Sequence, residues 1–369
     1  MRDRRSSSPV HGGGVAEGDE GGRKDEQNAR HPAVAALLGP PHALAKRAFL
    51  ALCLFALASG ALRVARSVPA ALEDMRLQAM PVATAPVTAS PLPHPERLGP
   101  FRVRQRLTLA APDARFGGLS GLAWRGDHLI AVSDRGFFLQ FAPDLAEVTI
   151  GPLQDTRGRP MRLGENDSED VAPLPDGRLA ISFEGDHRVW LYGPAPLSQP
   201  RAEAGPARTA AMRALRGNGG PEALCAAPDG TLLAGEEGPF VDRGPHGVWR
   251  ATPGAAGWER AFGIVAQPGW GLTACAVLPG GDLLTLERFW RPGAPFQARI
   301  GLVRDPFGPQ DQQPELLALL GPAEDVGNLE GVAQRTEPDG ALTIWLVSDN
   351  NYGDQATELW ELSLPASAP

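Results

Sequence analysis

Lysine is almost absent from this sequence of 369 residues. Its only two are Lys24 and Lys46. A Schiff-base lysine or a phosphate-binding P-loop lysine is therefore excluded from the long part of the chain that follows. Histidine is also scarce, and no two histidines have the spacing of a zinc site such as His-Glu-x-x-His. No Gly-x-Ser-x-Gly motif is present, which disfavours an α/β-hydrolase triad.

The chain also lacks an excess of positive charge, and it has few cysteines. Its formal net charge of −8 at pH 7 gives no reason to expect nucleic acid as a partner. Of the three cysteines, Cys53 lies in an apolar segment. We expect Cys225 and Cys275 to be small buried hydrophobic side chains. A disulfide between these two is the alternative, if the fold brings them together.

Glycine and proline are abundant instead. With 44 Gly and 37 Pro they make up more than a fifth of the chain. This composition favours many turns and short strands over long helices. The length allows one large domain or two ordinary ones.

The first third of the chain contains no repeat. Residues 1–47 mix charges of both signs without hydrophobic periodicity, which predicts a disordered extension. An uncharged apolar stretch of about 15 residues, 48–62, then follows a basic pair, and we assign residues 48–66 to a signal peptide or membrane anchor. The stretch is short for a spanning helix but long enough for a signal peptide, and Ala56-Leu57-Ala58 fits a cleavage site. An uncleaved anchor and a buried helix are the alternatives.

We therefore predict an exported protein that is periplasmic or anchored to the inner membrane, with contact to the membrane only through its N-terminal segment. Residues 67–98 are rich in Ala and Pro, which predicts a semi-extended linker.

An internal repeat begins near residue 100. Three segments align without gaps through Pro175, Pro228 and Pro279, and two divergent copies flank them. The three segments are 169–184, 222–237 and 273–288, and the flanking copies are 120–134 and 330–349. The copies start about 50 residues apart, which is the length of a β-propeller blade.

Each copy has the pattern of a β-hairpin. A short apolar run leads into Asp-Gly or an equivalent turn, and a second apolar run follows. We predict an all-β fold in which residues 99–369 form a β-propeller with five visible repeats and five or six blades. A sixth blade could lie in the irregular spans 138–165 or 291–327, or be closed by the strand around 101–109. The terminal strand around 359–363 could join the first and last strands of the ring in one blade.

Polar residues occupy two columns of the alignment. The first column precedes the first strand of each repeat, and the second follows the second strand. Because the two strands are antiparallel, we expect both columns to meet on one face near the axis. The first column is Ser120, Glu169, Glu222, Thr273 and Glu330, and the second is Asp134, Glu184, Glu236 with Glu237, Glu287 and Asp349.

Clustered carboxylates repel one another, and a cation relieves that repulsion. Oxygen ligands suit a hard ion, so we predict Ca²⁺ as the cofactor. The predicted metal ligands are Asp134, Glu169, Glu184, Glu222, Glu236, Glu287, Glu330 and Asp349. Structural acids that cap turns are the alternative for single members of this set.

Three arginines lie close to these acids in sequence. Guanidinium groups bind phosphate in a bidentate manner, although salt bridges to the acids are the simpler alternative. We predict a catalytic set formed by Glu169, Glu222 and Glu330 with Arg135, Arg188 and Arg288.

Several short motifs in this order resemble the phytase-like family, described as "esterase-like activity of phytase". The motifs are Gly-Leu-Ser-Gly-Leu (118–122), Ser-Asp-Arg-Gly (133–136), Asp-Ser-Glu (167–169), Ser-Phe-Glu (182–184) with His187 and Arg188, Pro-Glu-Ala-Leu (221–224), Leu-Glu-Arg (286–288), Asn-Leu-Glu-Gly (328–331) and Ser-Asp-Asn (348–350).

This resemblance covers residues 100–365. It implies a β-propeller with an acidic site and an activity on phosphoester or phosphodiester bonds, since the family is distantly similar to calcium-dependent propeller phytases. One departure is Ala274, which stands after Thr273 where an acid is expected. Its absence lowers the negative charge of the site.

Three function classes remain open. The first is a metal-dependent hydrolase that acts, as a monomer, on a small phosphate ester. The second is a non-catalytic propeller of the cell envelope that binds a ligand or protein partner. The third is a lactone- or sugar-oxidising propeller, for which His128 and His187 are the candidate catalytic histidines.

Overall fold

The computed structural model describes residues 73–365, apart from 163, 216–218, 239–243, 307, 309–310 and 354. The segments predicted to be a disordered extension and a signal peptide or anchor lie outside these residues. Within the described part, no helix has both the length and the apolar character needed to cross a bilayer.

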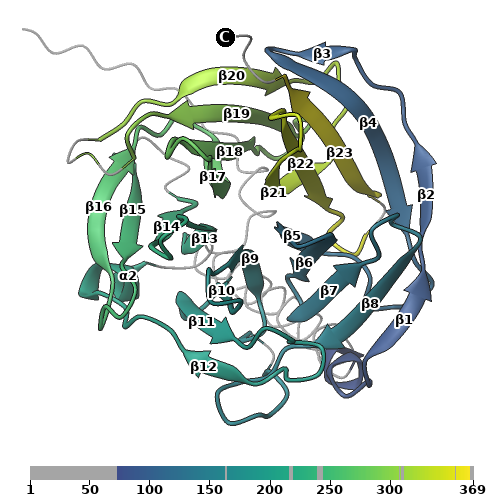
Figure 1. Ribbon diagram of the computed structural model, residues 1–369, viewed down its shortest axis with the longest axis vertical. Helices are drawn as coiled ribbons and strands as arrows, with labels where there is room; N and C mark the ends of the chain where they lie inside the picture. Colours follow the sequence, from purple (N-terminus) through teal and green to yellow (C-terminus); the bar gives the residue numbers. More distant parts are fainter. Residues whose placement is uncertain are drawn as a thin grey trace, which may run out of the picture. The chain divides into compact units, whose positions relative to one another are not determined.

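Five antiparallel sheets are arranged around a central axis, and each forms one blade of a β-propeller (Figure 1). The sequence left five or six blades open, and the described residues form five. The strand nearest the axis in each blade is the first strand of a repeat. These inner strands are β5 (Leu119–Arg125), β9 (Ser168–Pro173), β13 (Pro221–Ala226), β17 (Trp270–Val277) and β21 (Asn328–Thr336).

Three further strands complete each blade from the axis outward. The second strands are β6 (His128–Ser133), β10 (Leu179–Phe183), β14 (Leu232–Glu236), β18 (Leu283–Phe289) and β22 (Leu342–Asp349). The third strands are β7 (Phe137–Phe141), β11 (Arg188–Tyr192), β15 (His246–Ala251), β19 (Gln297–Val303) and β23 (Thr357–Leu364). The fourth strands are β8 (Glu147–Pro152), β12 (Ala202–Ala204), β16 (Glu259–Ile264), β20 (Glu315–Leu320) and β4 (Phe101–Ala110).

The hairpins between first and second strands form where the Asp-Gly turns predict them. Gly177 and Gly230 adopt φ values of 85° and 87°, which a residue with a side chain rarely adopts. The glycines therefore fix where each strand ends.

The ring is closed by strands from both ends of the described chain. In the last blade β4 pairs with β23 in antiparallel register, and Leu107 lies opposite Leu359. Both segments that the sequence offered for closure are used, and they are used together.

The propeller begins earlier than the sequence predicts. Part of the segment expected to be a linker adds edge strands to two blades: β1 (Ala83–Pro86) pairs with β8, and β2 (Thr88–Pro91) pairs with β4. The two-residue strand β3 (Arg97–Leu98) also pairs with β4. Prolines are tolerated here because an edge strand has one side without ladder bonds.

Helix is rare. A helical segment covers residues 73–78, and α2 (Ala210–Ala214) begins at the N-cap Thr209.

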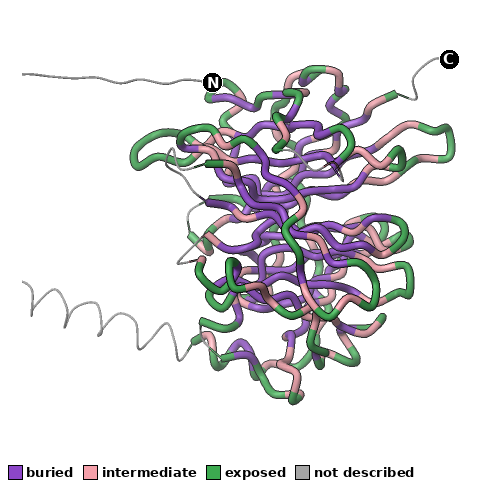
Figure 2. Tube along the Cα trace, turned by 90° about the vertical axis from the view of Figure 1, so that its left-hand side faces the viewer, coloured by how far each residue is buried: buried purple, intermediate pink, exposed green. Residues whose placement is uncertain are grey.

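The hydrophobic core consists of separate clusters between neighbouring blades. One cluster joins the fourth and fifth blades, with Trp360, Phe101 and Ile300 fully buried in it. In Figure 2 the buried residues run through the strands and the exposed ones gather at the turns.

Cys225 on β13 and Cys275 on β17 form a disulfide between adjacent inner strands. The expectation of two free cysteines is therefore wrong, because the ring places these two strands side by side.

Candidate functional site

A β-bulge interrupts all five inner strands at the same level. In β13, Pro221 pairs with Glu236 and Ala223 pairs with Gly235, so Glu222 is the extra residue. A bulge re-aims the extra side chain and strengthens the local twist. The extra residues are Ser120, Glu222, Thr273 and Glu330, and in β9 the pair Glu169 and Asp170 lies opposite Ser182. These positions are the first polar column of the sequence, and all of them are buried.

The second polar column begins where the second strands end, and the backbone joins it to the residues before the bulges. The Glu184 N–H donates to the carbonyl of Asp167, at 2.8 Å. The Glu237 N–H donates to the carbonyl of Gly220, at 3.0 Å. The two columns therefore meet at one end of the axis.

Three carboxylates form the tightest group there. One oxygen each of Asp167, Glu169 and Glu184 lies within 4.8 Å of the others, so this triad could hold a metal ion. Glu184 is buried, with only 7% of the residue exposed. Its Oε1 atom has no hydrogen-bond partner among the described residues. A buried carboxylate oxygen without a partner is costly, and a cation would satisfy it.

Electrostatic interactions connect this triad to five further acids. The eight are Asp134, Asp167, Glu169, Glu184, Glu222, Glu237, Glu330 and Asp349. Burial is the main cause that raises the pKa of every one of these carboxyl groups, and repulsion between neighbours adds to it for most of them.

Two of these pKa values lie near neutrality. Burial, followed by repulsion from Asp167 and Glu237, raises the pKa of Glu184 to about 8. Burial, followed by repulsion from Asp349 and Asp167, raises the pKa of Asp134 to about 8. At neutral pH the cluster must therefore hold protons or bind cations.

One arginine lies inside the cluster. Arg288 donates to Asn328 Oδ1 and to Glu330 Oε1, both at 2.7 Å, and it also forms an ion pair with Glu237. Burial works against its charge, but Glu330, Glu237 and Glu222 raise the pKa of this guanidinium. A single cation among eight carboxyl groups leaves most of the negative charge uncompensated.

Two of the predicted metal ligands point away from the axis. Glu287 forms an ion pair with Arg299 on β19. Glu236 accepts a hydrogen bond from the backbone of Gly247 on β15. Successive side chains of a strand alternate between its faces, so the next residues, Arg288 and Glu237, are the ones that face the acidic cluster. The sequence did not single out Asp167, although it stands two residues before Glu169.

The other two predicted arginines have different surroundings. The Arg188 guanidinium lies 4.3 Å from the Phe183 ring and 4.0 Å from the Trp190 ring, and it pairs with Asp186. These contacts hold it against its own blade. The Arg135 guanidinium lies 3.6 Å from the Tyr352 ring and 3.7 Å from Asp74 Oδ1.

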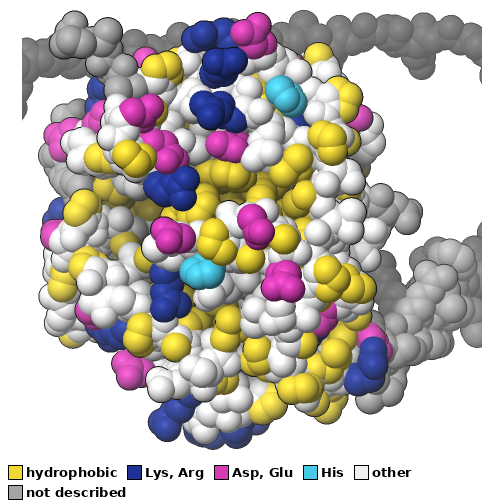
Figure 3. Space-filling model, turned by 45° about the vertical axis from the view of Figure 1, so that its right-hand side comes forward, with side chains coloured by type: hydrophobic (Ala, Val, Ile, Leu, Met, Phe, Trp, Pro, Cys, Tyr) yellow, Lys and Arg dark blue, Asp and Glu magenta, His cyan; other side chains and the backbone are white. Residues whose placement is uncertain are grey.

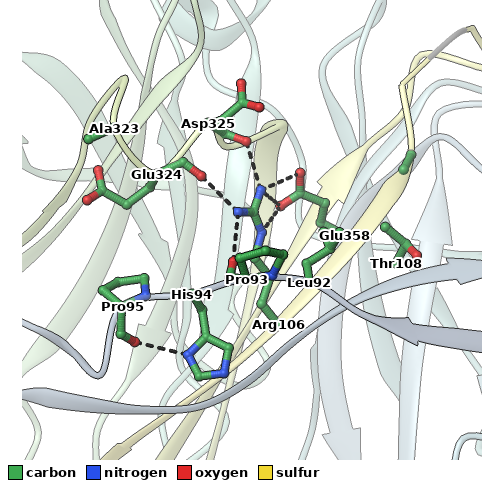
Figure 4. Close-up of a pocket in the computed structure, with 11 residues that line it drawn as sticks. Leu92, Pro93, His94, Pro95, Arg106, Thr108, Ala323, Glu324, Asp325 and Glu358 are labelled. Carbon is green, nitrogen blue, oxygen red and sulfur yellow. Dashed lines mark hydrogen bonds and ion pairs between the residues drawn. The ribbon is translucent and has the colours of Figure 1, made fainter.

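A cavity of about 610 Å³ lies away from the axis, beside β4 (Figure 4). Its central side chain, Arg106, is fully engaged. It donates to both Glu358 oxygens at 3.0 Å and to the carbonyls of Pro93, Glu324 and Asp325. These bonds connect the blade that closes the ring to neighbouring loops. They give Arg106, the charged side chain at the centre of this cavity, a structural role.

On the face shown in Figure 3, acidic and basic side chains lie next to one another with hydrophobic side chains between them.

The protein is a five-bladed β-propeller with a cluster of buried carboxyl groups at one end of its axis. A family model described as "Phytase-like: Esterase-like activity of phytase" matches residues 114–352. The match covers more than half of the chain, and the chain belongs to this family. No curated protein matches the sequence.

Solved β-structures resemble the chain only distantly. A gluconolactonase of Xanthomonas campestris is 15% identical over 77% of this chain and 99% of its own, with a TM-score of 0.42. A glutaminyl cyclase of Myxococcus xanthus is 13% identical over 68% and 92%, with a TM-score of 0.39. A thermostable family-43 glycoside hydrolase is 12% identical over 69% and 94%, with a TM-score of 0.44. Similarities of this degree say nothing about the chemistry of this chain.

Proposed function

We propose that this chain is a metal-dependent hydrolase that cleaves phosphoester or phosphodiester bonds at the acidic cluster. The observation that carries the proposal is the triad of Asp167, Glu169 and Glu184, in which the buried Oε1 of Glu184 has no hydrogen-bond partner among the described residues. Membership of a family described by esterase-like activity agrees with this reaction class.

Calcium fits the donor set best. All donors in the triad are carboxylate oxygens, and further carboxylates surround it. Ca²⁺ accepts six to eight oxygen ligands in flexible geometry, whereas Mg²⁺ requires a near-ideal octahedron and keeps several waters. When bound, Ca²⁺ polarises an ester oxygen as a Lewis acid.

The chain's own residues supply the rest of the chemistry. Asp167, Glu169 and Glu184 hold the cation, while Arg288 keeps Glu330 and Glu237 in place. Burial, followed by repulsion from Glu237 and Glu184, raises the pKa of Glu222 well above its usual range and so favours its protonated form. A protonated acid beside the triad can donate that proton to the leaving oxygen.

The disulfide supports export to an oxidising compartment. Such bonds persist in secreted and periplasmic proteins and are rare in the cytosol. The Cys225–Cys275 bond agrees with the signal peptide or anchor expected at residues 48–66. We propose that the propeller acts in the periplasm or at the outer side of the inner membrane.

The test uses the full chain, with Ca²⁺ or with a chelator. Chromogenic phosphomonoesters, phosphodiesters and carboxyl esters are assayed, and Ca²⁺ binding is measured by calorimetry. Glu184→Gln removes a triad charge. Asp176→Asn is the matched control. Asp176 is an exposed acid in a hairpin turn, where its side chain accepts a hydrogen bond from the Arg178 N–H.

Calcium-dependent turnover that is lost in Glu184→Gln and kept in Asp176→Asn supports the proposal. Calcium binding by the triad without turnover on any ester contradicts it. That outcome favours a non-catalytic envelope propeller that binds a ligand or a protein partner.

Of the two candidate histidines for an oxidising propeller, one lies close to the acidic cluster and the other does not. His187 is buried against Gly220, whose carbonyl accepts a hydrogen bond from the Glu237 N–H. His128 starts β6, at the far end of that strand from Asp134, and its ring nitrogen contacts the carbonyl of Phe141. It is therefore remote from the acidic cluster.

A further inference from the structure

Arg135 differs from the other arginines near the acidic cluster. The side chains of Arg188 and Arg288 are 7% and 15% exposed, and both are held by carboxylates, whereas the Arg135 side chain is 33% exposed. None of the hydrogen bonds among the described residues starts from the Arg135 guanidinium. Its donors are therefore available for an anionic ligand at the rim of the site.

The position of this side chain is nevertheless well defined. Its guanidinium lies against the Tyr352 ring, and the Tyr352 hydroxyl contacts Ser133 Oγ and the Arg115 carbonyl, both at 3.3 Å. The Arg135 carbonyl accepts hydrogen bonds from Gln78 and from Asn166. A stacked guanidinium keeps its in-plane N–H groups free for bidentate contacts to oxygen.

The arginine also lies close to the acids of the site. Its charge acts on both Asp134 and Asp349, which are members of the eight-carboxyl cluster. A ligand that bridges a cation at the cluster and Arg135 would need at least two anionic or polar oxygens. A phosphate group meets this requirement.

Among the described residues, the ion-pair partner of Arg135 comes from the N-terminal helical segment. Asp74 Oδ1 lies 3.7 Å from Arg135 Nε, too far for a hydrogen bond, and its side chain is 18% exposed. The same segment is anchored by Leu77, which is 1% exposed, and by Gln78, which is 5% exposed. The carboxylate is therefore held beside the guanidinium without engaging it closely.

We propose that Arg135 binds the phosphate group of the substrate, and that Asp74 is an internal competitor for the same guanidinium. The proposal rests on the proposed function, since it assigns a substrate contact within that site. It adds a regulatory role for the segment that precedes the propeller. The Asp74 carboxylate must move away from the Arg135 guanidinium when an anionic group binds there.

Binding of inorganic phosphate to the full chain tests this idea. Calorimetry at pH 6, with and without Ca²⁺, compares Asp74→Asn with the parent. Pairs as exposed as this one contribute little, so we expect phosphate to bind about two- to fivefold tighter in the variant. Arg135→Gln is expected to lose phosphate binding at least tenfold while it keeps Ca²⁺ binding.

Glu73→Gln is the matched control. Glu73 lies in the same segment and forms its ion pair with Arg76, and its charge interaction with Arg135 is weaker than the one with Arg76. Unchanged phosphate affinity in this variant supports a specific role for Asp74. Equal effects of the two substitutions would show that the segment acts by detaching, and this would overturn the proposal.

Unchanged or weaker phosphate binding in Asp74→Asn also overturns it. If no ester is hydrolysed but Asp74→Asn still tightens phosphate binding, the anion site stands and only the hydrolase proposal fails. The two proposals are thus tested separately.

Discussion

Arg288 and Glu330 come from neighbouring blades and meet at 2.7 Å beside the propeller axis. Arg288 lies on β18 directly after Glu287, which belongs to the second polar column. Glu330 is the extra residue of the bulge in β21. This pair links two blades at the point where the negative charge is densest. It offsets part of the negative charge of the acidic cluster before any cation binds.

Arg288→Gln should destabilise the metal-free protein by about 3–5 kcal/mol, since it leaves buried acids without their cation. Added Ca²⁺ should restore part of the loss. Denaturant unfolding with and without Ca²⁺ measures both effects. Arg304→Gln is the control, because Arg304 is 66% exposed and its loss should change stability by about 0.5 kcal/mol or less. Equal stabilities for the parent and Arg288→Gln would refute this role.

The metal-free protein should become less stable as the pH rises from about 5 to 8. The pKa values of Glu184 and Asp134 are raised to about 8 in the folded state. Between the unfolded and folded pKa values the native state binds more protons than the unfolded state, so the stability falls with increasing pH. Thermal melting across this range measures the trend.

Calcium should flatten this pH dependence, because bound carboxylates have lost their protons. Glu184→Gln should reduce the slope without Ca²⁺. A metal-free stability that rises steadily from pH 5 to 8 would show that the acids are ionised in the native state.

Loss of the disulfide should weaken the ring. The Cys225–Cys275 bond closes a loop with a sequence separation of 50 residues. The double substitution Cys225→Ala and Cys275→Ala should lower the free energy of unfolding by about 2–4 kcal/mol. A reducing agent should shift the parent by a similar amount and leave the double variant unchanged. A parent that does not respond to complete reduction would contradict this expectation.

Asp170 is expected to be structural rather than catalytic. Its carboxylate accepts hydrogen bonds from the backbone N–H of Leu224 on β13 and of Val171 on β9, both at 2.8 Å. Asp170→Ala should destabilise the protein by about 2–4 kcal/mol, since it leaves two buried donors unpaired. Calcium affinity of the folded variant should stay close to that of the parent. A selective loss of Ca²⁺ binding without loss of stability would place Asp170 among the ligands instead.

The repeat architecture was predictable because Pro-Asp-Gly or an equivalent turn marks each blade and sets the alignment of the copies. That alignment also located Glu169, Glu222 and Glu330 near the axis. The bulges that re-aim these side chains leave no signal in a single sequence. The inner strands are buried on both faces, so they show no alternation that an extra residue could shift. Alternation along a strand then decides whether Glu236 or Glu237 faces the cluster, and an error of one residue reverses the answer.

Pairing between side chains was not predictable from the sequence. Arg188 and Arg288 both lie within four residues after an acid of the second column. One stacks on aromatic rings of its own blade, whereas the other reaches an acid of the next blade. The edge strands β1 and β2 were hidden by their prolines, which normally argue against a strand. The disulfide depends on two inner strands becoming neighbours, and only ring closure brings this about.

That closure also has a consequence for the order of folding. Gln105 on β4 donates to Glu361 on β23 at 2.6 Å, across a separation of 256 residues. At about 5–20 residues per second, β4 waits roughly 10–50 s after its own synthesis for this partner. During that interval one of the longest strands of the propeller has an open edge, and open edges associate with other chains. Until β23 pairs with it, this edge of β4 is a site at which the nascent chain can aggregate.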